Sequence, residues 1–184
     1  NLGIILKEQD RLKDAEASLR QAITLKPNYA EAHNNLGIIL KEQDRLKDAE
    51  ASLRQAITLK PNYAEAHNNL GIILKEQDRL KDAEASYRKA ITLKPDYAEA
   101  HSNLGGILQR LGKLDEAEAC YRKAITLKPD YAEAHRYLTA IKKFDAQDEQ
   151  YSKMQELYLD KNISEEQRCH INFGLAKACE DLGD

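Results

Sequence analysis

Cysteine is scarce in this sequence and follows no spacing that would indicate metal or disulfide chemistry. The three cysteines are Cys120, Cys169 and Cys179, and no two of them have the C-x-x-C spacing. An odd number at irregular intervals argues against a disulfide framework and against a thiolate zinc site. The plain interpretation is a reducing, cytoplasmic setting.

Long hydrophobic runs and an excess of one charge are also missing. No apolar segment approaches the length that a membrane span needs, so we expect no membrane partner. The formal net charge is -3, and no basic stripe of the kind that binds phosphate backbones occurs along the chain. Nucleic acid is therefore not expected as a partner.

Motifs that carry catalysis are not found. The sequence has no nucleophile elbow, no glycine-rich phosphate loop and no H-E-x-x-H motif, so we expect neither an enzyme nor a cofactor. Four histidines recur at equivalent positions: His33, His67, His101 and His135. Neighbouring members should lie roughly 8–10 Å apart, one helix-to-helix distance, whereas zinc needs its nitrogens within about 2.1 Å. We therefore expect packed imidazoles rather than a metal site.

What the chain does contain is an internal repeat. Residues 1–34 are identical to residues 35–68, residues 69–102 differ from them at four positions, and residues 103–136 form a looser copy. A fixed period of this length is the signature of an array in which one supersecondary unit stacks on the next. Such an array buries its apolar surface between neighbours, so no single central core is expected.

Each copy predicts two antiparallel helices. From the end of the first copy into the second, apolar residues recur at steps of three and four from Ala30 to Leu40, and they recur again from Leu46 to Ile57, the period of one helix face. A turn at residues 43–45 separates the helices, and Pro61 ends the second one. Asn62, with Glu65 three residues later, predicts a capping box at the start of the next helix, as do the equivalent pairs in the other copies.

The repeat resembles the tetratricopeptide repeat, a helix-turn-helix unit of the same length. The resemblance rests on small, large and proline positions that agree in four copies, in the second copy Leu36, Gly37, Leu40, Ala49, Leu53, Ala56 and Pro61. It implies an all-α solenoid, a right-handed superhelix of antiparallel helix pairs whose first helices line a concave groove for a peptide or partner protein. Where the family usually has glycine in the turn, this chain has Asp10, Asp44 and Asp78, and only the fourth repeat has Gly112.

We expect two segments. Residues 1–136 hold four tandem repeats, the first lacking the beginning of its first helix, and residues 137–184 hold an irregular helical segment. In that segment, residues 137–143 complete a first helix and residues 145–159 form another, with Tyr151, Met154, Leu157 and Tyr158 on its apolar side. Ser164 begins a last helix that runs to Leu182. Residues 173–184 resemble the first helix and turn of another tetratricopeptide hairpin. This tail resembles the region that precedes the catalytic domain in bacterial fusions of tetratricopeptide repeats with sulfotransferases.

The candidate binding site is the face of the first helices that packing leaves unused. Stacking turns each position on this face into a ladder, and the predicted groove residues are Asn1, Asn35, Asn69, Asn103, Asn34, Asn68, Ile38, Ile72, Lys41 and Lys75. An asparagine amide can pair with the backbone of an extended peptide whatever its side chains. The array resembles that of O-linked N-acetylglucosamine transferases, in which an asparagine at the equivalent place grips extended polypeptide.

Three alternatives stay open. The asparagines can simply solvate the groove or bond helices to one another. The array can be the substrate-docking domain of a larger transferase, a sulfotransferase ahead of a glycosyltransferase. It can also associate head to tail with other copies, because near-identical repeats make its two ends complementary and the first copy leaves Ile5 and Leu6 uncovered.

Overall fold

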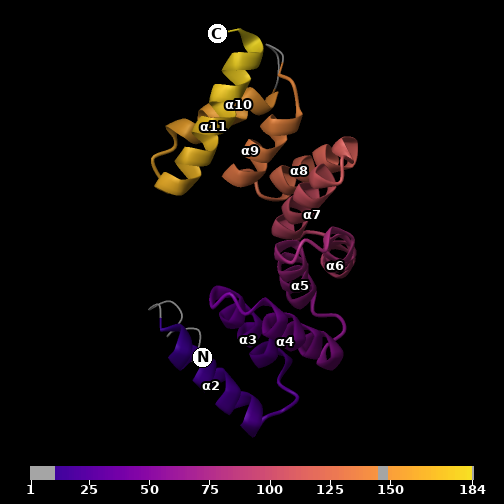
Figure 1. Cartoon of the computed structure of the whole chain (residues 1–184). Helices are drawn as coiled ribbons and strands as arrows, with labels where there is room; N and C mark the ends of the chain where they lie inside the picture. The colour runs from indigo at the N-terminus through magenta and orange to yellow at the C-terminus, as the bar shows by residue number, and fades with distance from the viewer. Residues whose placement is uncertain (1–10, 145–148, 184) are drawn as a thin grey trace. The chain divides into compact units, whose positions relative to one another are not determined.

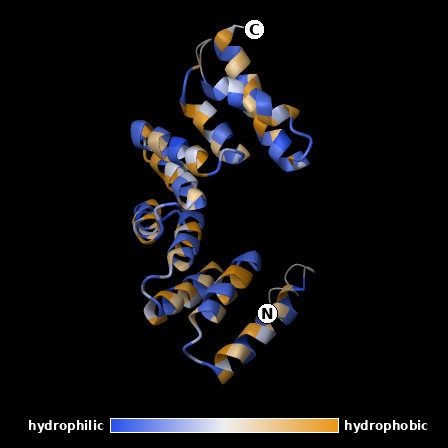
Figure 2. Cartoon of the chain, turned by 180° about the vertical axis from the view of Figure 1, so that it is seen from behind, coloured by the Kyte–Doolittle hydropathy of each residue, from blue (hydrophilic) through white to orange (hydrophobic). Residues whose placement is uncertain are grey.

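The computed structural model describes residues 11–144 and 149–183, and in these ranges the chain is all-α, with helices and no strand (Figure 1). The helices are α2 (Leu12–Leu25), α3 (Ala30–Glu42), α4 (Leu46–Leu59), α5 (Ala64–Glu76), α6 (Leu80–Leu93), α7 (Ala98–Arg110), α8 (Leu114–Leu127), α9 (Ala132–Ile141), α10 (Glu149–Leu159) and α11 (Glu165–Leu182). Hydrophobic and hydrophilic residues alternate along every one of them (Figure 2), as expected for helices that bury one face.

The chain forms two compact units. The first, residues 1–95, contains α2 to α6, and each helix packs on its neighbour in the chain, with a further contact between α3 and α5. The second, residues 96–184, contains α7 to α11, in which α9 lies against both α8 and α11. The predicted boundary between residues 136 and 137 falls inside this second unit and stays a prediction.

Glycine brings the two helices of each hairpin close together. An added Cβ at Gly37 would lie 2.6 Å from Leu53 Cγ, and one at Gly71 would lie 2.6 Å from Cε1 of Tyr87. Both partners are buried, with at most 1% of their surface exposed. Any side chain at these glycines would push the second helix away, so the small residues predicted at the helix contact are required there.

The aspartates in the turns adopt the left-handed conformation. Asp44 and Asp78 have φ values of 59° and 60°, and Gly112 at the equivalent position has a φ of 75°. In the turn at Asp44, the amide of Arg45 donates to the carbonyl of Leu40 over 2.9 Å. Aspartate tolerates this conformation better than most residues, so the hairpin forms as expected. Asp10 lies outside the described residues.

The predicted capping boxes at the first helices are wrong. The residue before α5 is Tyr63, whose side chain makes no capping bond, and the same holds for the tyrosines before α3, α7 and α9. The turn after proline includes Asn62, so the helix starts one residue later than a box would require. Glu65 instead accepts a hydrogen bond from Lys94 over 3.2 Å. The acidic residue thus ties two repeats together.

Ion pairs between second helices also link the repeats of the first unit. Arg45 donates to Glu16 over 2.9 Å, and Arg79 donates to Glu50 over the same distance. Burial alone would raise the pKa of Glu50, but the hydrogen bonds from Arg54 and Arg79 outweigh burial and lower that pKa. Each pair joins residues 29 apart, so it fixes one repeat against the next.

The last three helices confirm most of the expectation for the tail. α9 ends at Ile141, and α11 begins after Ser164, where the predicted capping box with Gln167 is complete. α10 starts at Glu149, and residues 145–148 lie outside the described part. Tyr158 was expected on the apolar side of α10, but it is 40% exposed, because it follows Leu157, which occupies the buried side.

Substituting adjacent glycines tests the close approach within the hairpin. A methyl group at Gly105 would lie 2.7 Å from Tyr121 Cε1, whereas at Gly106 the nearest contact is 3.7 Å away. We expect Gly105→Ala to destabilise the chain by about 1–3 kcal/mol through overpacking. Gly106→Ala should be neutral or stabilising by up to about 1 kcal/mol, because alanine favours helix over glycine. Urea unfolding measures both, and equal midpoints for the two variants would contradict the packing argument.

Candidate functional site

The predicted groove face in the first unit is formed by α3 and α5, which contact each other. The ladder residues on these helices are all partly buried: Asn35, Ile38 and Lys41 on α3, and Asn69, Ile72 and Lys75 on α5. Partial burial leaves one edge of each side chain for a partner. Asn1 lies outside the described residues.

Asn34 joins the two helices beneath this face. Its Oδ1 accepts a hydrogen bond from Nδ2 of Asn69 over 3.0 Å, and its Nδ2 lies 3.4 Å from Oδ1 of Asn35. Asn34 and Asn68 are each only 4% exposed, so little of either side chain is left for a partner to touch. The sequence period predicted both residues in the groove, but Asn34 faces the next first helix, α5, where its amide bonds Asn69.

Lysine at the third ladder position is engaged by acidic neighbours. Lys41 Nζ lies 3.5 Å from Glu42 and 3.7 Å from Glu76. All three side chains are about one third exposed or more, so solvent screens these pairs and they contribute little to stability. The consequence is that this lysine already has carboxylate neighbours on the groove face of the first unit.

The groove face changes character in the second unit. On α7, Asn103 keeps the asparagine position, but Gly106 and Gln109 replace the isoleucine and lysine of the earlier repeats, and all three residues are partly buried. Gln109 Oε1 accepts a hydrogen bond from the hydroxyl of Tyr121 over 3.0 Å. A buried core tyrosine therefore reaches the groove face here.

On α9, the thirty-four-residue register puts Tyr137 where the earlier repeats have asparagine. Its ring lies 5.7 Å from that of Tyr121, and the guanidinium of Arg136 lies 4.8 Å from its centroid. The repeats predicted from the sequence end at residue 136, so the predicted groove residues do not include Tyr137. Extending the register by one residue would have found it.

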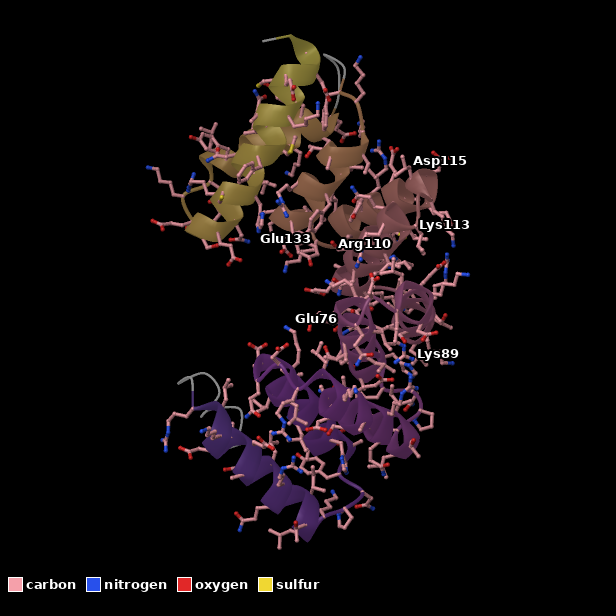
Figure 3. All side chains as sticks on the ribbon, viewed as in Figure 1. Glu76, Lys89, Arg110, Lys113, Asp115 and Glu133 are labelled. Atoms are coloured by element: carbon pink, nitrogen blue, oxygen red, sulfur yellow. The ribbon has the colours of Figure 1, made fainter. Side chains whose placement is uncertain are left out.

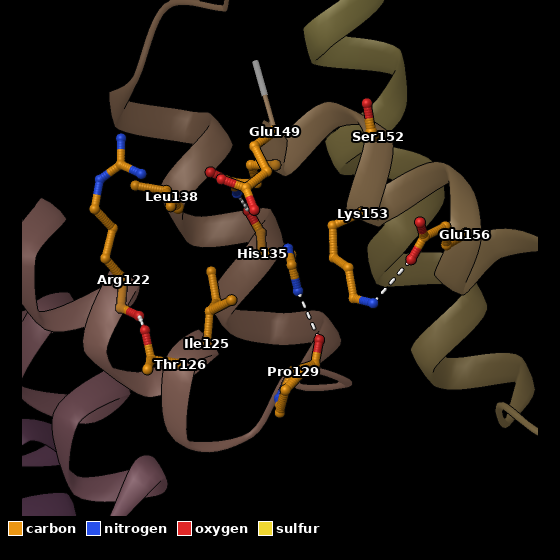
Figure 4. A pocket seen from close by; sticks show the side chains of 11 residues that line it. Arg122, Ile125, Thr126, Pro129, His135, Leu138, Glu149, Ser152, Lys153 and Glu156 are labelled. Carbon is orange, nitrogen blue, oxygen red and sulfur yellow. Dashed lines mark hydrogen bonds and ion pairs between the residues drawn. The ribbon is translucent and has the colours of Figure 1, made fainter. Parts of the chain in front are cut away.

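A second kind of concave surface lies along the second helices. One example encloses about 560 Å³ between α8, α9 and α10 (Figure 4), and related pockets of about 440–450 Å³ lie in the first unit around His33 and His67. Figure 4 shows two interactions at its wall: Lys153 is bonded to Glu156 over 2.8 Å, and His135 is bonded to the carbonyl of Pro129 over 2.9 Å. None of the ladder residues lines these pockets.

The histidines have a local structural partner. The imidazoles of His33, His67 and His135 each bond through Nε2 to the carbonyl of the proline six residues earlier, at 2.9–3.1 Å. Each bond fastens the turn to the following helix. In residues 11–144 and 149–183, no three His, Cys, Asp or Glu side chains are grouped closely enough to hold a metal ion.

Comparison with known proteins identifies the family. Models of the tetratricopeptide repeat match residues 3–44, 39–78, 73–112 and 98–131. The chain belongs to the tetratricopeptide repeat family. Among curated proteins, none matches the chain.

Solved structures share the fold of the tetratricopeptide repeat (TPR) family. TTC0263, a thermophilic TPR protein of Thermus thermophilus, is 21% identical, with a TM-score of 0.74 over 95% of this chain and 96% of that chain. PilF of Pseudomonas aeruginosa is 20% identical, with a TM-score of 0.74 over 98% and 85%. YrrB, a TPR protein with an unusual peptide-binding site, is 21% identical, with a TM-score of 0.65 over 99% and 84%. At these identities the likeness establishes the fold, an all-α TPR solenoid.

Among the described residues, no helix is both long and apolar enough to cross a membrane.

Acidification tests the role of the buried histidines. Burial lowers the pKa of His135 below its ordinary 6.5, and burial likewise lowers the pKa of His67. The unfolded chain therefore binds protons more readily than the folded chain as the pH falls below about 6.5, and stability drops. We expect a lower urea midpoint at about pH 5.5 than at about pH 7.5, with a smaller difference in His135→Gln, whose amide can still donate to Pro129. An unchanged difference in the variant would contradict this.

Proposed function

We propose that this TPR chain is a non-catalytic interaction module that holds an extended peptide or a partner protein against the first helices of its repeats. Arrays of this family generally serve as protein-interaction scaffolds, and YrrB has a peptide-binding site on the same fold. The observation that carries the proposal is the row of partly buried amides on α3 and α5.

The amide row keeps hydrogen-bonding capacity after its internal contacts are made. An asparagine side chain has two N–H donors and an acceptor oxygen with two lone pairs. Asn69 gives one N–H to Asn34, and that bond holds its amide in one orientation. A fixed amide loses less side-chain entropy when it binds a peptide backbone than a freely rotating one. The internal bond therefore supports binding rather than replacing it.

Apolar contact accompanies the amides. Ile38 and Ile72 lie one helical turn from Asn35 and Asn69 and are partly buried. An extended peptide alternates its side chains between two faces, so backbone bonds to the amides place every second side chain toward the isoleucines. The proposed partner in the first unit is thus an extended segment with small or apolar side chains on one face.

Replacing the ladder asparagines tests the proposal. We expect the triple variant Asn35→Ala, Asn69→Ala, Asn103→Ala to weaken binding of a peptide selected from a library by roughly tenfold or more, since several hydrogen bonds are lost. Fluorescence anisotropy measures the affinity, and circular dichroism should show unchanged helicity.

The matched control for that experiment carries alanine at Thr58, Thr92 and Thr126. These threonines are exposed on the second helices, and each hydroxyl bonds only its own helix backbone. This control should bind like the parent chain. If the asparagine variant binds the selected peptide as tightly as the parent does, the ladder has no role in recognition.

A more specific form of this proposal is that the module docks substrates for a transferase, with a sulfotransferase ahead of a glycosyltransferase. It rests on the likeness of residues 137–184 to the region before the catalytic domain in such fusions. Reading the gene beyond Asp184 tests it directly. A nucleotide-sulfate binding loop would support the transferase, and a stop codon would remove it.

Self-association is the second candidate function, and exposed apolar side chains in the last two helices favour it. Phe173 on α11 is 62% exposed and Leu159 at the end of α10 is 75% exposed. We expect the sedimentation-average mass of the chain to rise with concentration, and the rise to be reduced in Phe173→Ser. Leu114→Ser, at a residue of α8 that is 49% exposed, is the control. A strictly monomeric chain at all concentrations would exclude this function.

A further inference from the structure

The groove face of the second unit differs from the repeats before it at neighbouring register positions. In the thirty-four-residue register, Gly106 is equivalent to Ile72 and Gln109 is equivalent to Lys75. Tyr137 is equivalent to the asparagine of the earlier repeats. Arg136 occupies the position of the buried Asn34 and Asn68, but is only partly buried. Gly106, Gln109 and Tyr137 lie on the groove face of α7 and α9, and Arg136 lies at the edge of that face, next to Tyr137.

Arg136 has no acceptor in the described part of the chain. Its side chain stacks on Tyr137, with 4.8 Å from the guanidinium carbon to the ring centroid, and makes no hydrogen bond or ion pair with any described residue. Its Nε is buried without a hydrogen-bond partner. A partner cannot reach this buried Nε. An acceptor that binds Arg136 therefore bonds the terminal nitrogens of its guanidinium, which have no acceptor among the described residues and offer a charge-assisted hydrogen bond.

Open space lies at Gly106 on α7, the helix that contacts α9. At Gly106 a Cβ would meet a single atom within 4 Å, the hydroxyl oxygen of Tyr121, at 3.7 Å. The rings of Tyr121 and Tyr137 are tilted by 30° with centroids 5.7 Å apart, and Tyr137 keeps part of its surface exposed. An aromatic side chain of a partner fits such a surface, because offset and tilted ring contacts are favourable.

Local charge favours a carboxylate at this place. α3 and α5 each carry one lysine and two glutamates, whereas α7 and α9 each carry one arginine and one glutamate. Those two glutamates face bases, with Glu99 3.6 Å from Lys128 and Glu133 3.8 Å from His170. In Figure 3, Lys113 and Asp115 lie on the right of the second unit, far from Glu133 of α9.

The charge of the whole unit limits the partner to few carboxylates. Residues 96–184 contain twelve lysines and arginines and seventeen aspartates and glutamates, a net charge of -5. A strongly acidic peptide would be repelled over distances of about 8–10 Å, the screening length in physiological salt. A single carboxylate bonded directly to Arg136 gains a charge-assisted hydrogen bond without that penalty.

We infer that Arg136, Tyr137 and the space at Gly106 form a side-chain subsite that selects an extended peptide with one carboxylate next to an aromatic residue. The inference rests on the proposed peptide-binding function and gives it sequence preference. The carboxylate accepts hydrogen bonds from the Arg136 guanidinium, and the aromatic ring packs on Tyr137 over Gly106. The competing explanation is that Arg136 and Tyr137 only pack α9 onto α8.

A double-mutant cycle separates the two explanations. The probes are fluorescein-labelled glycine-serine octapeptides with a central Asp-Tyr, Asn-Tyr or Asp-Ser pair, titrated against the full chain. We expect Arg136→Asn to raise the Kd of the Asp-Tyr peptide roughly tenfold, the loss of one charge-assisted hydrogen bond, and to leave the Asn-Tyr peptide unchanged. Tyr137→Asn, which restores the ladder residue, should reduce the preference for Asp-Tyr over Asp-Ser.

The control variant is Arg122→Asn, which removes the same charge from the same unit. Arg122 pairs with Glu118 on α8 and lines the pocket of Figure 4, outside the groove face. It should not change the Kd of any probe. If all three peptides bind with one affinity, or Arg122→Asn weakens the Asp-Tyr peptide as much as Arg136→Asn does, the subsite is wrong while peptide binding stands. If no peptide binds, the proposed function fails as well.

Discussion

The close approach of two helices at a glycine is the constraint on which three hairpins of the described residues depend: α3–α4, α5–α6 and α7–α8. Gly37, Gly71 and Gly105 each leave room for one large side chain from the second helix, which is leucine in one hairpin and tyrosine in the next two. The exchange of Leu53 for Tyr87 and Tyr121 keeps the site filled but adds a hydroxyl. A buried hydroxyl needs a partner or costs about 1–3 kcal/mol.

That hydroxyl couples the core to the groove face. Tyr121 donates to Gln109, whereas the hydroxyl of Tyr87 is buried with no partner among the described residues, because the equivalent groove position there is Lys75. The replacement of lysine by glutamine thus has a packing reason in addition to any role in binding. It also explains why the groove face changes where the core changes.

The sequence predicts the helices and turns within each repeat, but it does not predict which side chains of one repeat contact the next. Helix bounds, the turn geometry at Asp44 and the start of α11 at Ser164 follow from local patterns, because they depend on residues a few positions apart. The capping boxes failed because Glu65 bonds Lys94, twenty-nine residues away. Asn34 was placed in the groove because helical period alone does not tell which neighbour covers a side chain. The thirty-four-residue register predicts the ladder of Asn35 and Asn69. The same register reaches Tyr137, but the predicted groove residues ended with the fourth repeat.

Identical repeats leave the register of a bound peptide along the array undetermined. Residues 1–34 and 35–68 present the same groups, so a peptide held only by backbone bonds to asparagine gains the same energy if it shifts by one repeat. Shifted complexes then coexist, and neither the position nor the direction of the peptide is set. A side-chain contact made at one place removes this degeneracy, because only one register satisfies it. Arg136 and Tyr137 occur once in the sequence, so a contact to their side chains exists in one register only. Backbone bonds to asparagine supply affinity, and a single subsite supplies specificity.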